Sequence, residues 1–206
     1  MAGIDFHIVQ EYFEMNGFFV RQLRKNQVSK RGRKSKKQED EIDLMVMNPR
    51  SVIEERELNF MLFANDLRYI RRAILSVKGW HTMRFTPGIL RSSSGLFRFL
   101  ERDVLKRAEE LFSTQDEAPE DLHPFHKILV LPGLPIKEPH RSQSIALLQE
   151  HGVDAIISFR AMLQEMIQRV EPVRNYDTSE LLQTIRLLKN YDMLKDPQME
   201  LFQQKT

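Results

Sequence analysis

The sequence contains no cysteine among its 206 residues. This absence excludes a disulfide scaffold and any metal site built on thiolates, and it fits the reducing environment of the cytosol. No apolar run approaches the roughly 20 residues that a membrane-spanning helix needs. The N-terminal stretch MAGIDFHIVQEYF also lacks the basic and apolar segments of a signal peptide. The sequence therefore predicts a soluble cytoplasmic protein with no membrane partner.

An excess of one charge is also missing, because the formal net charge is only +2. The distribution is nevertheless uneven: eight basic and no acidic residues lie within 24–37, and acidic residues follow at 39–41. Such a run is usually a solvated loop. It can also bind phosphates, since each neutralised phosphate releases counterions. We interpret it as a nucleic-acid-binding arm whose contacts are Lys30, Arg31, Arg33, Lys34, Lys36 and Lys37.

Hydrophobic periodicity and turn residues predict an alternation of helices and strands. Helices are expected over 5–16, where Asp5 is a candidate N-cap, and over 95–112, 142–151, 160–170 and 178–191; strands are expected over 18–23, 41–47, 73–78, 127–135 and 153–159. The runs KILVLP and DAIISF are apolar on both faces, as strands between two helical layers are. We predict an α/β fold with a mixed central β-sheet flanked by helices.

The domain organisation follows from the same pattern. Residues 1–195 form one α/β domain without an internal repeat, and the basic arm over 24–38 is inserted between its first two strands. Residues 196–206 form a flexible C-terminal tail after Asp196-Pro197. A homodimer is compatible with this organisation.

Two of the expected strands carry charged residues at a spacing of two. Glu41 and Asp43 share one face of their strand, and Ile42, Leu44 and Val46 take the opposite face. In the strand over 73–78 the same rule places Ile74, Ser76 and Lys78 on one face. If the two strands pair, a carboxylate and an ammonium group converge.

That convergence suits phosphodiester hydrolysis. Carboxylate oxygens hold hard divalent cations such as Mg²⁺ or Mn²⁺. The cation lowers the pKa of bound water and neutralises phosphate charge, while a lysine helps to activate water or stabilises the developing oxyanion. The residues alone also allow a simpler interpretation, in which Glu41 and Asp43 are an edge-strand acid pair and the Lys78 side chain extends to solvent.

The order of a helix, a strand, an acidic residue in the next strand, a strand ending in lysine, a helix and a strand resembles the restriction-endonuclease-like, or PD-(D/E)XK, nuclease superfamily. The resemblance covers roughly residues 5–160 and is carried by GFFVRQL, EIDLMV and LSVKGW. It implies that Asp43 binds the metal with Glu41, that Lys78 is catalytic, and that Glu11 supplies the acid of the first helix. The superfamily usually carries an acidic residue two positions before the lysine, and this sequence has Ser76 there.

The C-terminal tail reads DPQMELFQQKT. Gln198, Met199, Leu201 and Phe202 resemble the peptide by which bacterial replication and repair proteins bind the sliding clamp. The open alternative is that Leu201 and Phe202 dock on the core of their own domain.

Together these observations predict a Mg²⁺- or Mn²⁺-dependent DNA endonuclease of repair, recombination or defence. The alternative is a nuclease-fold protein that binds nucleic acid or a partner without cleaving, and Ser76 favours it. A third alternative is a structural protein in which the charged residues only form salt bridges.

Overall fold

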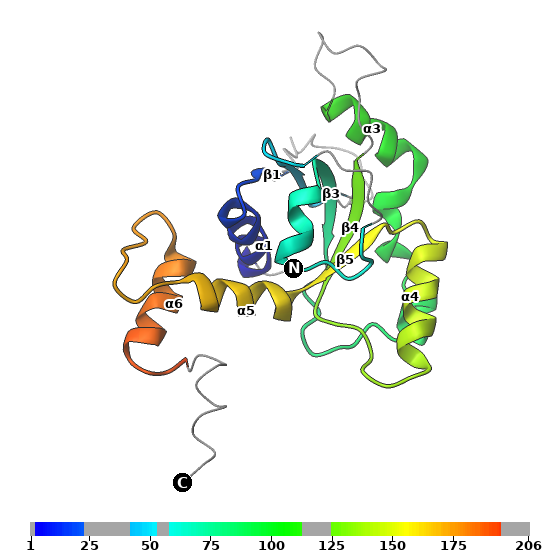
Figure 1. The fold of residues 1–206 in the computed structure, drawn as a ribbon. Helices are drawn as coiled ribbons and strands as arrows, with labels where there is room; N and C mark the ends of the chain where they lie inside the picture. Colours follow the sequence, from blue (N-terminus) through cyan, green and yellow to red (C-terminus); the bar gives the residue numbers. More distant parts are fainter. Residues whose placement is uncertain (1–2, 23–41, 53–57, 113–124, 195–206) are drawn as a thin grey trace, which may run out of the picture.

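The computed structural model describes residues 3–22, 42–52, 58–112 and 125–194. Its centre is a five-stranded sheet in the order β1-β2-β3-β4-β5 (Figure 1). The strands are β1 (Phe19–Gln22), β2 (Leu44–Met47), β3 (Arg72–Val77), β4 (His126–Leu131) and β5 (Ala155–Ser158). The first two pairings are antiparallel and the last two are parallel. The expected α/β architecture with a mixed central sheet is therefore confirmed.

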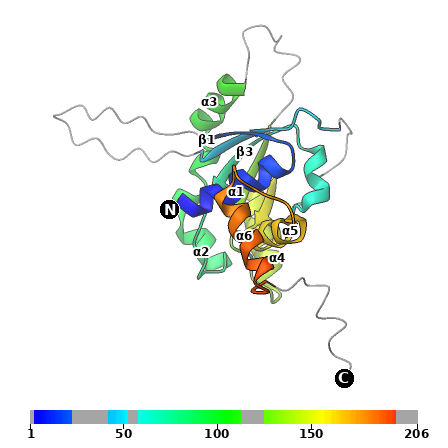
Figure 2. The ribbon, with the colours of Figure 1, turned by 90° about the vertical axis from the view of Figure 1, so that its left-hand side faces the viewer.

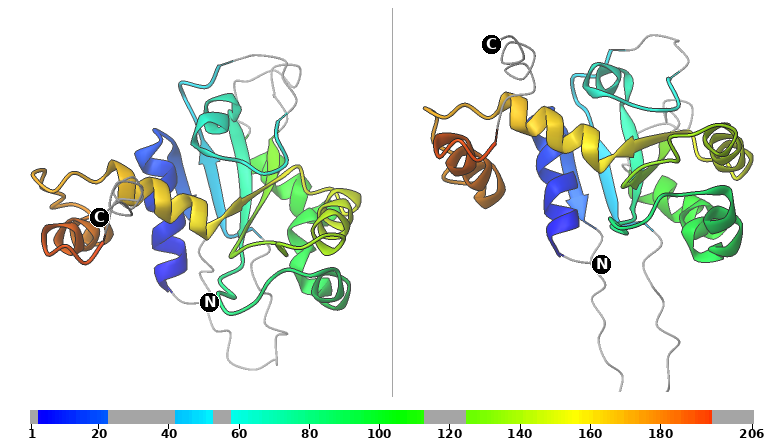
Figure 3. Two further views of the ribbon diagram at one scale, coloured as in Figure 1. Left: turned by 60° about the horizontal axis from the view of Figure 1, so that its bottom comes forward. Right: turned by 90° about the horizontal axis from the view of Figure 1, so that it is seen from below.

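Helices cover both faces of the sheet, as Figure 3 shows from below. One face packs against α1 (Gly3–Met15), η1 (Ala64–Tyr69), α5 (Phe159–Arg169) and α6 (Glu180–Asn190). In Figure 2 three of these, α1, α5 and α6, lie in front of the sheet. The other face packs against α2 (Pro87–Ser92), η2 (Ser94–Leu96), η3 (Arg98–Leu100), α3 (Arg102–Phe112) and α4 (His140–Glu150).

The two helical layers explain the apolar runs of the central strands. All six residues of β3 are buried, and so are 128–131 in β4 and 155–157 in β5. Side chains of a strand alternate between two apolar environments here, so most residues of these strands are apolar on both faces; Arg72 and Ser76 of β3 are buried polar exceptions. Within the described ranges no helix has the length and apolarity to cross a membrane.

The apolar segment NFMLF, residues 59–63, lies outside the helices and the named strands. The N–H of Leu62 donates to the carbonyl oxygen of Ile156 at 2.9 Å, and the N–H of Ile156 donates to that of Phe60 at 2.7 Å. This short segment therefore runs beside β5 and occupies hydrogen-bonding groups that an edge strand would otherwise expose.

The helix expected over 95–112 is confirmed for Arg102–Phe112, which is α3, and is wrong for the residues before it. Two short 3₁₀ turns precede α3, and Glu101 has an extended backbone between them and the helix. The carbonyl oxygen of Glu101 then accepts from Val104 and Leu105, which starts α3. Buried Leu96 and Phe99 are three residues apart, the spacing that a 3₁₀ turn brings onto one side.

Candidate functional site

The region of interest is the end of β3, where β2 enters the sheet with an irregular pairing. Leu44 pairs with Leu75, and the N–H of Asp43 also donates to the Leu75 carbonyl oxygen at 3.0 Å. Leu44 of β2 and the preceding Asp43 thus oppose one residue of β3, which is the arrangement of a β-bulge. A bulge bends its strand and redirects a side chain, and here the redirected side chain is that of Asp43.

The bulge corrects one expectation about the faces of β2. Leu44 and Val46 belong to the core that packs on α1, whereas Ile42 belongs with Met45 to the opposite core. The prediction that Ile42 shares a face with Leu44 and Val46 is therefore wrong. Strict alternation by two fails because the extra residue shifts every position before it by one.

The carboxylate of Asp43 closes the hydrogen-bond ladder at the end of β3. Its Oδ2 accepts from the N–H of Val77 at 2.6 Å and lies 3.4 Å from the hydroxyl of Ser76. Lys78 follows directly, and its N–H donates to the carbonyl oxygen of Val130 in β4 at 2.8 Å. The Asp43 carboxylate and Lys78 are therefore at the same end of β3, because the residue that donates to Asp43 directly precedes Lys78.

Asp43 is the carboxylate that this site could offer to a cation. Among the described residues, no group of three or more histidine, cysteine, aspartate or glutamate side chains is arranged to hold a metal ion. Ser76 is only 1% exposed, so the position two before Lys78 holds a buried neutral hydroxyl. Asp43 supplies one carboxylate, and Glu41, the second expected ligand, lies outside the described residues.

Glu11 has a contact at another place in the fold. Its Oε2 accepts from the hydroxyl of Ser179 at 2.6 Å, and the same hydroxyl accepts from the N–H of Leu182 in the first turn of α6. The carboxylate therefore links α1 to the N-terminus of α6, where the positive end of the helix dipole stabilises a negative charge. This contact is a structural role for Glu11.

The acid of α1 that reaches the end of β3 is Asp5. It is 2% exposed, and its Oδ1 lies 2.8 Å from Nε2 of His81. The His81 ring also packs edge-on against Phe159, with 4.7 Å between ring centroids. Asp5 lies within the first turn of α1, so its expected role as N-cap is wrong.

Gly79 makes room for this buried carboxylate. A Cβ at position 79 would overlap Oδ2 of Asp5 and would lie 2.5 Å from its Cγ. After Lys78, the backbone of Gly79 thus lies close to Asp5, and the imidazole of His81 is oriented by its bond to the same carboxylate. Sequence reasoning missed this pair because its members are 76 positions apart, and no local pattern connects them.

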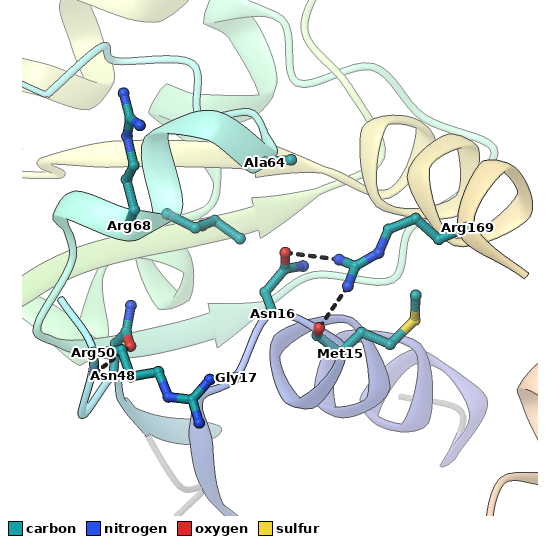
Figure 4. A pocket seen from close by; sticks show the side chains of 9 residues that line it. Met15, Asn16, Gly17, Asn48, Arg50, Ala64, Arg68 and Arg169 are labelled. Carbon is teal, nitrogen blue, oxygen red and sulfur yellow. Dashed lines mark hydrogen bonds between the residues drawn. The ribbon is translucent and has the colours of Figure 1, made fainter. Parts of the chain in front are cut away.

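A separate pocket of about 380 Å³ opens at the other end of β3 (Figure 4). Its lining includes Arg50, Arg68 and Arg169. The Arg169 guanidinium donates to Oδ1 of Asn16 at 2.9 Å and to the carbonyl oxygen of Met15 at 2.8 Å. These contacts satisfy the C-terminal end of α1 and fix α5 against it. The arginine therefore acts as a cap between two helices.

The basic arm over 24–38 and the C-terminal tail with Gln198, Met199, Leu201 and Phe202 lie outside the described residues. No family model matches the chain, and the searches of curated proteins and of solved structures also found no match.

Proposed function

We propose that this chain is a metal-dependent nuclease that hydrolyses phosphodiester bonds of DNA at the end of β3. The observation that supports the proposal is the Asp43 carboxylate, held by the N–H of Val77 beside Lys78. The order α1, β1, β2, β3, α2 and α3, β4 is the one that the restriction-endonuclease-like core would require.

In this proposal Asp43 and Glu41 hold Mg²⁺ or Mn²⁺. Such a cation lowers the pKa of bound water and neutralises phosphate charge. The Lys78 ammonium stabilises charge that develops on the phosphate. The arm over 24–38 contacts the phosphates of the duplex, and those contacts weaken as the salt concentration rises.

A second candidate function is nucleic-acid binding without cleavage. Two observations favour it: Ser76 is buried where the superfamily carries an acid, and the Asp43 carboxylate already has a structural hydrogen bond in the sheet. The Asp43 carboxylate would be needed for this hydrogen bond even in a protein that does not cleave nucleic acid.

The experiment is a cleavage assay on linear, nicked and single-stranded DNA with Mg²⁺ or Mn²⁺. Asp43→Asn removes the charge and keeps an oxygen that accepts from Val77, and Lys78→Met removes the ammonium at similar length. We expect each to reduce cleavage by roughly 10²-fold or more, as the loss of one charge-stabilising group does. The control variants Asp103→Asn and Lys106→Met alter exposed groups on α3 and should cleave normally.

The outcomes separate the two candidates. Cleavage that persists in both Asp43→Asn and Lys78→Met contradicts the proposed site. An intact chain that binds DNA in a salt-dependent manner and cleaves no form with either metal supports the second candidate. An intact chain that neither binds nor cleaves nucleic acid contradicts both.

We further propose that the tail binds a bacterial sliding clamp through Gln198, Met199, Leu201 and Phe202. A purified clamp should be retained by the full chain and lost when Leu201 and Phe202 are both changed to alanine. Equal retention by the two would contradict this part of the proposal.

A further inference from the structure

The loop after β3 carries an exposed aromatic ring close to the proposed site. Trp80 follows Lys78 by two residues, and 41% of it is exposed. Its indole is stacked on the ring of Phe85, with 5.4 Å between centroids and 9° between planes. Phe85 is fully buried in the core. One side of the indole is therefore supported by the protein interior, while much of the residue remains open to solvent.

The loop holds this ring in a fixed position. On one side, His81 is bonded to the buried Asp5, and its N–H donates to the Gly79 carbonyl oxygen at 3.0 Å. On the other side, the N–H of Phe85 donates to the Gly133 carbonyl oxygen at 3.1 Å. A turn closes between these anchors, since the N–H of Met83 donates to the Trp80 carbonyl oxygen at 3.0 Å. A partner that stacks on Trp80 therefore loses little free energy in ordering the loop.

The charges around the ring suit a polyanion. The Cα atom of Lys78 lies at most about 7 Å from that of Trp80, the span of two extended residues. Arg84 is exposed, and its guanidinium lies against Gly133, where a Cβ would overlap Nη1. Trp80 lies in the sequence between the cationic residues Lys78 and Arg84. Aromatic rings that stack on bases, together with cations that hold phosphates, are the combination by which proteins bind single strands.

We propose that Trp80 stacks on an unpaired nucleobase and thereby directs single-stranded or frayed nucleic acid to the end of β3. The proposal rests on the proposed nucleic-acid function and adds the substrate form. A base inside an intact duplex has both faces covered by its neighbours, so it offers no face to the indole. An unpaired base offers one, and the stack of base, Trp80 and Phe85 then continues into the core.

The test uses the fact that Trp80 is the only tryptophan of the chain. Its fluorescence is measured without divalent metal during titration with a single-stranded thymidine dodecamer, an abasic oligomer with the same phosphates, and a closed circular duplex. We expect strong quenching by the dodecamer alone. In parallel, anisotropy of a labelled dodecamer reports affinity for the intact chain, Trp80→Leu, Trp80→Phe and the neighbouring control Met83→Ala.

Trp80→Leu should weaken dodecamer binding roughly 5- to 100-fold, the range for one aromatic–base stack. It should leave abasic binding unchanged, because the phosphate contacts remain. Trp80→Phe should retain most of the affinity, and Met83→Ala, which changes an exposed side chain of the same turn, should retain all of it.

Three results would overturn the inference, and they have different consequences for the proposed function. Dodecamer binding without a change in tryptophan emission refutes stacking and leaves nucleic-acid binding intact. The absence of binding to all three probes refutes both. A wavelength of maximum tryptophan emission that shifts with protein concentration but not with oligonucleotide shows that Trp80 contacts a second copy of the chain. This result also refutes stacking.

Discussion

Replacement of Gly79 by alanine should destabilise the protein because of one side chain. The three atoms nearest to a Cβ at position 79 would all belong to the Asp5 carboxyl group. This Cβ would lie 2.5 Å from Cγ of Asp5, which is too short for a van der Waals contact. Asp5 is 2% exposed and cannot move into solvent without breaking its contact with His81. A hydrogen bond to a charged group contributes about 1.5 to 3 kcal/mol, so the free energy of unfolding should fall by about 2 to 3 kcal/mol.

The measurement is urea and thermal unfolding of Gly79→Ala. For a chain of this size the expected loss corresponds to a fall in Tm of roughly 5 to 10 °C. Gly88→Ala is the matched control, because the nearest atom to its Cβ would be 3.9 Å away. Gly88 lies inside α2, where alanine should be neutral or stabilise by up to about 1 kcal/mol.

A double-mutant cycle tests the cause. In an Asp5→Ala background the carboxyl group is gone, so Gly79→Ala should cost close to nothing. It could even stabilise by about 0.4 to 1 kcal/mol, because alanine restricts the unfolded chain more than glycine does. If Gly79→Ala is equally costly in both backgrounds, the overlap with Asp5 is not the reason for the glycine, and the reasoning fails.

Two further predictions concern the helical layer and β4. Ser179→Ala removes the N-cap of α6 and the donor to Glu11, so it should cost about 2 kcal/mol in urea unfolding. Ser158→Ala, which removes only the N-cap of α5, should cost about 1 kcal/mol; equal costs would mean that the Glu11 contact contributes nothing. Burial lowers the pKa of His126 from its usual 6.5, with Asp154 partly opposing the shift. The unfolded chain therefore takes up the proton first, so stability is lost as the pH falls from 6.5 through the lowered folded-state pKa. His126→Gln should flatten this loss in urea midpoints, the exposed His140→Gln should not, and identical slopes for all three proteins would contradict the assignment.

The central sheet could be predicted because burial on both faces leaves a local record. β4 and β5 are short runs of apolar residues, and the order of elements follows from their spacing. The short helix α2 was missed although Thr86 and Pro87 form an N-cap and first position. Apolar periodicity also continues across Glu101, where the backbone is extended. Periodicity reports which side chains face the core, and it does not report where the backbone between them stops being helical.

The candidate site was predictable only where its residues are close in sequence. Lys78 could be assigned to the end of a strand, and Asp43 to a neighbouring one, from local alternation. The bulge at Asp43 could not, because two-against-one pairing depends on the partner strand. The approach of Asp5 to Gly79 and His81 depends on how α1 packs on the sheet, which no window of sequence contains.

Asp43 connects the fold and the proposed chemistry, and its two roles can be separated. The role in the sheet needs an oxygen that accepts from the N–H of Val77, which asparagine also provides. The proposed role toward a cation needs the negative charge, which asparagine lacks. Asp43→Asn should therefore keep the unfolding midpoint near that of the intact chain, while Asp43→Ala should lower it, because a backbone N–H at the end of β3 loses its acceptor. If the protein uses Asp43 only as the hydrogen-bond acceptor for Val77, Asp43→Asn will keep every measurable property. If the charge matters as proposed, the same variant will remain folded and lose metal-dependent cleavage.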